Sequence, residues 1–243
     1  KSVNLITSLG AQDSHEEFVR ESLKSNVNMR SLMNESAPTT KKTRYIDPGY
    51  SMRKLFEVYV MDDSPASSGL QGQIEREILE QISEADVVIV TDFGHGLISD
   101  RTISLLCENA KFLAVNAQSN SANFGFNLIS RYPRADYICI DEPEARLATH
   151  DKISPLPVVI EKGLAAQIDC GRTIVTQGKN GCLTYEKGGS ISRVPALTST
   201  IVDTVGAGDA FFVITAPLAS LDIPMPYIGL LGNAAGAMKV GVV

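Results

Sequence analysis

Apolar residues occur along this chain either in short continuous runs or at helical spacing, and the two patterns alternate. Short runs of strand length lie at 3–9, 87–91, 112–115 and 137–140. The run at 87–91 is typical of a parallel strand buried on both faces. Strands that alternate with helices predict a three-layer α/β fold, with a mostly parallel sheet and helices on both of its faces.

Helical spacing predicts several helices and their limits. The run at 3–9 should stop at Gly10, and Asp13 or Ser14 should cap a helix whose apolar face carries Phe18, Val19 and Leu23. A loop is expected at 64–72, before a helix with Ile74, Ile78 and Ile82 on one face. Further helices are predicted at 158–168, at 210–216 where Pro217 should end or kink the helix, and at 228–240.

A hairpin is predicted between the first helix and this loop. Residues 38–46 lead to a Pro48-Gly49 turn signal, and residues 54–60 alternate as a half-exposed strand does. A second hairpin is predicted at 173–182, where a Gly-x-x-Gly turn joins two strands, and 190–194 should form the last strand.

Composition excludes some functions without choosing one. The 243 residues are 44% hydrophobic and 21% charged, as in an ordinary globular protein, and the net charge of −6 argues against a broad nucleic-acid surface. No apolar run has membrane-spanning length, and residues 1–10 lack the features of a signal peptide. The four cysteines show no Cys-x-x-Cys spacing and the three histidines are scattered, so we expect a reduced, cytoplasmic protein without a cysteine or histidine metal cluster.

The strongest chemical signal is the stretch 203–212, Asp-Thr-Val-Gly-Ala-Gly-Asp-Ala-Phe-Phe. Gly206, Ala207 and Gly208 allow a tight turn into a helix, whose first N–H groups favour an anion. Asp209 follows at once, and a carboxylate beside an anion site suits a general base for an acceptor hydroxyl. The alternatives are an ordinary capped turn or half of a dinucleotide fingerprint, but Phe211 stands where the third glycine of that fingerprint belongs.

This stretch resembles the C-terminal signature of the ribokinase/PfkB carbohydrate kinases. The resemblance implies that Asp209 is the catalytic base and that the loop holds the phosphates of ATP. It further implies that the Thr-x-Gly-x-x-Gly segment, with Thr176, Gly178 and Gly181, lies on the ATP side. The segment around Asn233 and Gly236 resembles the one that flanks the adenine, although small residues there also suit close helix packing.

Polar residues follow three of the predicted strands, at the sheet edge where ligands bind in open α/β folds. Asp92-Phe-Gly94-His95-Gly resembles a substrate segment with histidine in place of lysine; Asp92 could instead cap the next helix, and His95 could be a turn residue. Asn116 begins an amide-rich loop, up to Asn127, that could bind a polyol, although relatives usually have Asp-Pro-Lys or Asp-Pro-Asn here.

The third of these segments is the motif formed by Asp141 and Glu144. It stands where the family has Asn-x-x-Glu, a motif tied to Mg²⁺ and phosphate. By spacing alone it is also a reciprocal capping box.

The resemblance also implies that the hairpin is a lid, at about 38–62, that closes over the sugar and can pair two subunits into a homodimer. Pro-Thr-x-x-Lys-x-Arg, with Lys42 and Arg44, resembles the heptose-7-phosphate kinase branch, the kinase part of ADP-heptose synthases. These two cations are either contacts for an anionic sugar or solvated charges of the lid.

The sequence therefore predicts a single PfkB-type kinase domain at 1–243, lacking the family's first strand and its C-terminal end. The expected activity is ATP- and Mg²⁺-dependent phosphorylation of a sugar or sugar-phosphate hydroxyl. The alternatives are a non-catalytic sugar- or nucleotide-binding pseudokinase module of a larger protein, and a transferase acting on a non-sugar alcohol such as a vitamin.

Overall fold

The computed structural model describes residues 2–47, 49, 53–119, 123–198 and 202–241. The chain forms two compact units, each built from two separate stretches. Lys1–Ser83 and His95–Leu105 form the first unit, and Glu84–Gly94 and Leu106–Val243 form the second. The chain thus runs from the first unit to the second, returns to the first, and then stays in the second.

The second unit is organised around a six-stranded sheet with the order β10-β9-β8-β7-β6-β5. Four strands are parallel: β5 (Val88–Asp92), β6 (Leu113–Ala117), β7 (Arg134–Asp141) and β8 (Asp169–Thr176). The remaining two, β9 (Cys182–Glu186) and β10 (Ser192–Val194), are antiparallel to their neighbours. All five residues of β6 are buried, as its position between β5 and β7 requires.

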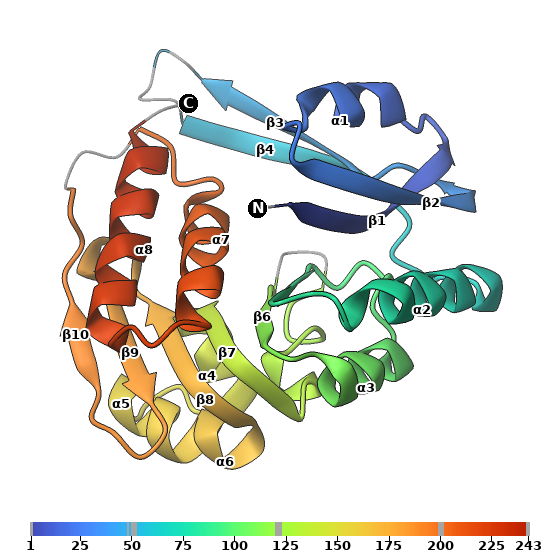
Figure 1. The fold of residues 1–243 in the computed structure, drawn as a ribbon. Coiled ribbons are helices and arrows are strands. Elements are labelled where there is room, and N and C mark those ends of the chain that lie inside the picture. Colours follow the sequence, from blue (N-terminus) through green and yellow to red (C-terminus); the bar gives the residue numbers. More distant parts are fainter. Residues whose placement is uncertain (1, 48, 50–52, 120–122, 199–201, 242–243) are drawn as a thin grey trace. The chain divides into compact units, whose positions relative to one another are not determined.

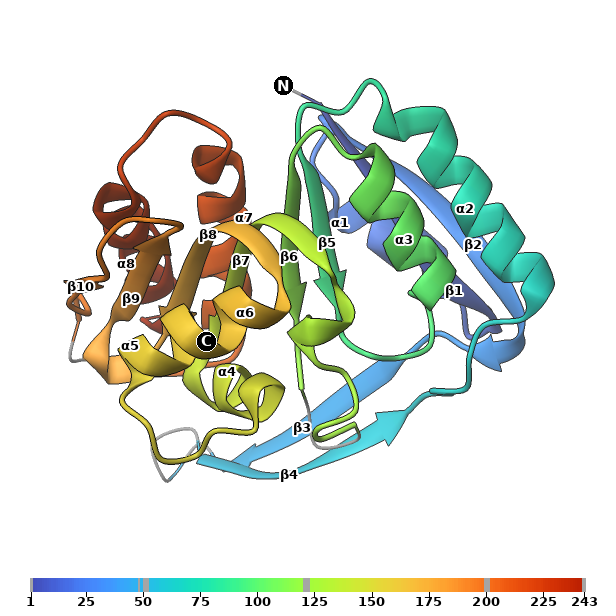
Figure 2. The same cartoon turned by 90° about the horizontal axis from the view of Figure 1, so that it is seen from below.

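Helices cover both faces of this sheet (Figures 1 and 2). On one face lie α7 (Ala207–Ala219) and α8 (Met225–Val240), whose apolar residues pack with Tyr137 and Ile174 of the strands. On the other face lies α4 (Glu142–Thr149), together with α5 (Leu156–Val158), the π-helical turn η2 (Val159–Leu164) and α6 (Ala165–Gln167). This arrangement agrees with the predicted three layers and mostly parallel sheet. Two short 3₁₀ turns complete the unit, η1 (Ile129–Arg131) and η3 (Gly178–Asn180).

The first unit contains two strand pairs and a helix that packs on one of them. Strands β1 (Val3–Gln12) and β2 (Val27–Pro38) are parallel and are joined through α1 (Glu16–Ser22). Helix α2 (Ser68–Ile82) packs on this pair. The predicted hairpin is confirmed as an antiparallel pair of β3 (Lys41–Asp47) and β4 (Arg53–Val60). Helix α3 (Asp100–Asn109) begins in this unit and ends in the second.

Several predicted limits in the first unit are wrong. Strand β1 continues through Gly10, because Gly10 pairs with Asn34 of β2 and its N–H donates to the Thr39 hydroxyl. Helix α1 is short and leaves Phe18 70% exposed; its N-cap residue His15 makes no side-chain cap, but the hydroxyl of Ser14 accepts the N–H of Glu16 at 3.5 Å. The expected loop at 64–72 ends early, since the Ser67 hydroxyl accepts the N–H of Leu70 and starts α2 there.

Two predictions for the second unit are also wrong: the burial of the strand at 87–91 and the bounds of the helix at 210–216. Strand β5 is the edge of the six-stranded sheet, and Ile89 is exposed while Val90 is buried, so the run at 87–91 is not covered on both faces. Helix α7 begins at Ala207 and continues past Pro217 to Ala219. Pro217 lies in the last turn and lacks the N–H that would donate to the carbonyl of Val213, an exposed residue in the middle of α7, so the predicted end at 216 is wrong, whereas a kink at Pro217 stays a prediction.

Candidate functional site

The predicted signature loop leads directly into α7. Gly206 has φ 77°, a left-handed conformation that glycine adopts without strain, and it forms the N-cap. The carboxylate of Asp203 accepts the N–H of Val205, and this turn holds the approach to the helix. Asp209 is the third residue of α7, so its carboxylate lies in the first turn, where the helix dipole favours negative charge.

The start of α7 leaves two backbone donors for a ligand. The N–H of Ala207 donates to the carbonyl of Thr204 at 3.2 Å, and the first intrahelical bond is that from Ala210 to Gly206. The N–H groups of Gly208 and Asp209 precede that bond and therefore have no partner within the helix. Among the described residues, the N–H groups of Gly208 and Asp209 therefore stay available for an anion, whereas that of Ala207 is used in the turn.

Residues directly after β6 contact carboxylates on two different helices. The side-chain amide of Gln118 donates to Oδ1 of Asp209 at 2.7 Å, and the backbone N–H of Ser119 donates to Oε1 of Glu144 at 3.1 Å. Asp209 belongs to α7 and Glu144 to α4, on opposite faces of the sheet. The loop after β6 therefore brings the predicted base and the predicted metal residue to one edge of the sheet.

The predicted capping box at α4 is present. The carboxylate of Asp141 accepts the N–H of Glu144 at 2.7 Å, and that of Glu144 accepts the N–H of Asp141 at 2.9 Å. Burial, and then the nearby charges of Asp141 and Asp209, raise the pKa of Glu144 to about 7. A cation bound beside these three carboxylates would reverse that repulsion and keep Glu144 ionised.

A metal ion at this place would depend on its own waters and on a ligand. Within the described ranges, no group of three histidine, cysteine or acidic side chains has the geometry to hold one. Mg²⁺ fits such a site, because it keeps several waters and is usually bound by one or two carboxylates plus substrate phosphates. Asp141 and Glu144 could supply those carboxylates.

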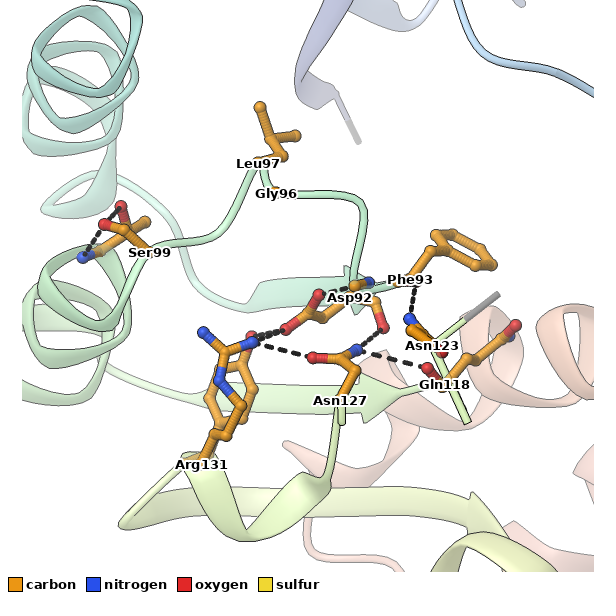
Figure 3. Close-up of polar contacts among 12 residues, drawn as sticks. Asp92, Phe93, Gly96, Leu97, Ser99, Gln118, Asn123, Asn127 and Arg131 are labelled. Carbon is orange, nitrogen blue, oxygen red and sulfur yellow. Dashed lines mark hydrogen bonds and ion pairs between the residues drawn. The ribbon is translucent and has the colours of Figure 1, made fainter. Parts of the chain in front are cut away.

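Asp92, at the carboxyl end of β5, is only 3% exposed and lies in a hydrogen-bonded network (Figure 3). Its Oδ1 accepts the N–H of Gly94 at 2.9 Å, and its Oδ2 accepts the hydroxyl of Tyr132 at 2.9 Å, with Arg131 Nη1 at 3.5 Å. Burial and the Asp92 charge raise the pKa of Tyr132 far above its usual value, so the phenol stays a donor. The alternative that Asp92 caps the next helix is wrong, since the hydroxyl of Ser99 caps α3 through the N–H of Thr102.

Gly94 closes this network against the loop after β6. It has φ 69°, and any β-carbon there would collide with the side chains of Asn123 and Asn127. The amide of Asn123 donates to the carbonyl of Phe93, and that of Asn127 donates to the carbonyl of Asp92. Glycine at position 94 thus allows the backbone after β5 to approach the amide-rich loop closely.

Asn116 is turned inward. It is 8% exposed, and its Nδ2 donates to the carbonyl of Cys139 in β7 at 2.7 Å, while its Oδ1 is buried without a hydrogen bond among the described residues. The amide-rich loop therefore has a strong structural role, because Asn116, Asn123 and Asn127 each bond to a strand end or its continuation. A substrate contact by Asn116 stays a prediction.

The residues predicted to bind the nucleotide all lie in the second unit, where they form two groups. Gly181 lies against the backbone of 194–196, and the amide of Asn233 donates to the carbonyls of Val194 and Pro195. Gly236 lies one turn further along α8, and a β-carbon there would be 3.8 Å from the carbonyl of Ala207 in the signature loop. Thr176 ends β8 beside Asp141, with Gly178 in the following turn. Their part in binding ATP stays a prediction.

The hairpin cations have partners within the hairpin. Lys42 Nζ lies 5.0 Å from the centre of the Tyr59 ring, and Arg44 Nε donates to Glu57 at 2.6 Å. Hydrogen bonds from Tyr59 first, and then from Arg44 and Lys54, lower the pKa of Glu57 to about 2. Elsewhere in the first unit, His95 lines a cavity of about 120 Å³ with residues of β1, β2 and the stretch 62–66.

Sequence reasoning missed the residues that hold the site together. These are Gln118, Ser119, Asn127, Arg131 and Tyr132. The amide-rich composition of 116–127 was a signal for the first three, but the sequence pointed to a polyol rather than to protein groups as their partner. Arg131 and Tyr132 gave no signal, because a basic and an aromatic residue in a short turn are common.

Comparison with solved structures shows that the chain has a ribokinase-like α/β fold. The tetrameric inhibited form of phosphofructokinase-2 from Escherichia coli matches with a TM-score of 0.78, at 15% identity, over 98% of this chain and 77% of that chain. Ribokinase from Thermotoga maritima matches with a TM-score of 0.69, at 17% identity, over 99% of this chain and 75% of that chain.

The model of the pfkB family of carbohydrate kinases matches residues 1–243, and the chain belongs to that family. Among curated proteins, Bifunctional protein HldE of Rhodopseudomonas palustris (strain HaA2) is 27% identical over 184 residues, which are 74% of this chain and 36% of that protein. HldE of Wolinella succinogenes is 25% identical over 217 residues, 86% of this chain and 43% of that protein. The chain thus spans less than half the length of these relatives.

Proposed function

We propose that this chain transfers the γ-phosphate of ATP to a hydroxyl of a sugar or sugar phosphate. One observation carries the proposal: the Asp209 carboxylate lies in the first turn of α7, beside the N–H groups of Gly208 and Asp209, which have no hydrogen-bond partner among the described residues. A phosphate and an acceptor hydroxyl need these two functions side by side. Membership of a carbohydrate kinase family supports the same reaction. No comparison supports the non-catalytic alternative.

In the proposed reaction, Asp209 takes the proton of the acceptor hydroxyl while its oxygen attacks the γ-phosphorus and the bond to ADP breaks. The N–H groups of Gly208 and Asp209 donate to the transferring phosphoryl group. Mg²⁺, held by the ATP phosphates near Glu144 and Asp141, would neutralise phosphate charge. Because phosphoryl transfer depends mainly on positioning and electrostatics, these parts suffice for catalysis.

The nucleotide would lie along the second unit, toward β8, β9 and α8. Thr176, Gly178, Gly181, Asn233 and Gly236 are the residues we assign to it. The family implies ATP as the phosphate donor. Since Asn233 already donates to the chain at Val194 and Pro195, its proposed role is to shape the pocket wall through that segment.

For the acceptor we propose an anionic sugar, with a heptose phosphate as the first candidate because of the HldE relatives. In the second unit the proposed contacts are Asp92, Gly94 and Asn116; in the first unit they are Lys42, Arg44 and His95. Arg44 is 37% exposed in its side chain, so a phosphate could compete for it with Glu57. The β3–β4 lid also exposes Leu55, Phe56 and Val58, and we propose it as the contact of a homodimer.

Among the helices of the described residues, none is both long enough and apolar enough to span a membrane. The cytoplasmic location and the single-domain organisation stay predictions.

The test is a coupled assay of ADP release on the full-length protein, with ATP-Mg²⁺ and a panel of sugars and sugar phosphates. We expect acceptor-dependent ADP release, and Asp209→Asn should lower kcat by about 10²–10⁴ because a general base contributes that much. Calorimetry beside the assay measures binding. Binding of both ligands without ADP release would contradict the proposal, as would full turnover by Asp209→Asn.

A further inference from the structure

The hydrogen bond between Gln118 and Asp209 joins parts of the chain that are 91 residues apart. Gln118 Nε2 lies 2.7 Å from Asp209 Oδ1, a short distance for a neutral donor. The direction of the bond is fixed by chemistry, because an ionised carboxylate only accepts and the side-chain amide nitrogen only donates. Among the described residues, this is the one side-chain hydrogen bond of the Asp209 carboxylate.

Gln118 is itself held in place by its backbone. Its N–H donates to the carbonyl of Asp92 at 2.8 Å, and its carbonyl accepts the amide of Asn127 at 3.3 Å. Asn127 is 3% exposed, and its Oδ1 accepts Arg131 Nη1 at 2.8 Å (Figure 3). The donor that reaches Asp209 is therefore a partly buried side chain whose backbone is held by hydrogen bonds at the ends of β5 and β6.

This geometry has a specific effect on a carboxylate base. A donor on Oδ1 fixes the rotation of the carboxylate, so that the second oxygen points in one direction toward an acceptor hydroxyl. A base whose position is fixed in advance loses less rotational freedom when the transition state forms. A bond to the charged form also strengthens with that charge, as bonds to ionised groups do.

We propose that Gln118 is a positioning residue for the general base, holding Oδ1 of Asp209 so that Oδ2 receives the acceptor proton. This inference rests on the proposed kinase function. It assigns Gln118 to the base rather than to the sugar, and it requires an N–H donor of sufficient reach at this position. Packing alone would require only a side chain of the same shape.

Three variants distinguish a need for the N–H donor from a need for the shape of the side chain. For each one we would measure kcat, the KM for ATP and the midpoint of unfolding. Gln118→Met keeps the shape and removes the donor, Gln118→Asn keeps the amide but shortens its reach, and Gln118→Lys keeps a donor on a longer stem. We expect kcat to fall about tenfold in the Met and Asn variants, the size of one lost bond to a charged group, with KM for ATP unchanged. The Lys variant should stay within about threefold of the wild type.

A double variant then tests whether Gln118 acts through Asp209. If it does, Gln118→Met should lower kcat no further in an Asp209→Asn background, because the group it positions is already absent as a base. An equal loss in both backgrounds would overturn the inference, and so would a Met variant that keeps the wild-type kcat while the Lys variant loses it. No turnover by the wild-type protein would overturn the proposed function together with this inference, whereas wild-type turnover with an unaffected Met variant would overturn the inference alone.

Discussion

Gly232→Ala tests how closely α8 must approach α7. Gly232 is buried in the middle of α8, and an added β-carbon would lie 2.5–2.7 Å from three atoms of the Phe211 ring. Phe211 follows Asp209 by two residues in α7 and is 4% exposed. The ring packs in the core with Phe212 and Ile228, so it has little room to move aside.

Two effects of this substitution oppose each other. Alanine is a better helix former than glycine by about 1 kcal/mol in a helix interior. Forcing an extra carbon into a packed core costs about 1–3 kcal/mol. Contacts this short lie at the unfavourable end of that range, and we therefore expect a net loss of about 1–2 kcal/mol in the free energy of unfolding.

Gly236→Ala in the same helix is the matched control. Its β-carbon would meet the carbonyl of Ala207 at 3.8 Å, an ordinary contact, so only the gain in helix propensity of about 0.5–1 kcal/mol applies. Urea denaturation should place Gly232→Ala below the wild type and Gly236→Ala above it. In a thermal scan each kcal/mol should move Tm by about 2–4 °C for a chain of this size. A Gly232→Ala protein as stable as Gly236→Ala would refute the close-packing argument.

Two further predictions concern polar groups that are partly or fully buried. The pKa of Glu144 is raised from 4.5 to about 7, so its protonated form stabilises the fold fully below pH 4.5 and this contribution is lost as the pH rises through 7. Compared with Glu144→Gln, the wild type should therefore lose stability between about pH 4.5 and 7 in denaturation with EDTA and no nucleotide; parallel pH curves would contradict this. Tyr132→Phe removes the hydroxyl that donates to buried Asp92 and should cost about 1–3 kcal/mol in urea denaturation, while a loss below about 0.5 kcal/mol would show that Arg131 compensates.

Local patterns in the sequence predicted the fold where burial and spacing agree. The strands at 112–115 and 137–140, the capping box at Asp141 and the hairpin at 38–60 all have strong local signals, and all are present. Strand β2 (Val27–Pro38) was missed because its residues are mostly polar or unbranched, and its place is fixed by pairing with β1. The prediction that the strand at 87–91 is buried on both faces was wrong, because the sequence does not show which strand lies at the edge of the sheet.

The site shows the same division between local and distant information. Asp209 and its loop follow from a contiguous motif, in which each residue type has a local reason. The bond from Gln118 to Asp209 links residues 91 positions apart, and no periodicity carries that information. The inward turn of Asn116 likewise depends on β7 lying beside β6, which is a tertiary fact.

Transfer of labelled phosphate tests the kinase account most directly. The full-length protein is incubated with ATP labelled at the γ-phosphate, Mg²⁺ and a candidate heptose phosphate, and the product is analysed by ³¹P NMR. The account predicts a new phosphate ester on a sugar hydroxyl that carries the label, with formation slowed by about 10²–10⁴ in Asp209→Asn. Label that appears only as inorganic phosphate, or an ester that Asp209→Asn forms at the wild-type rate, would contradict it.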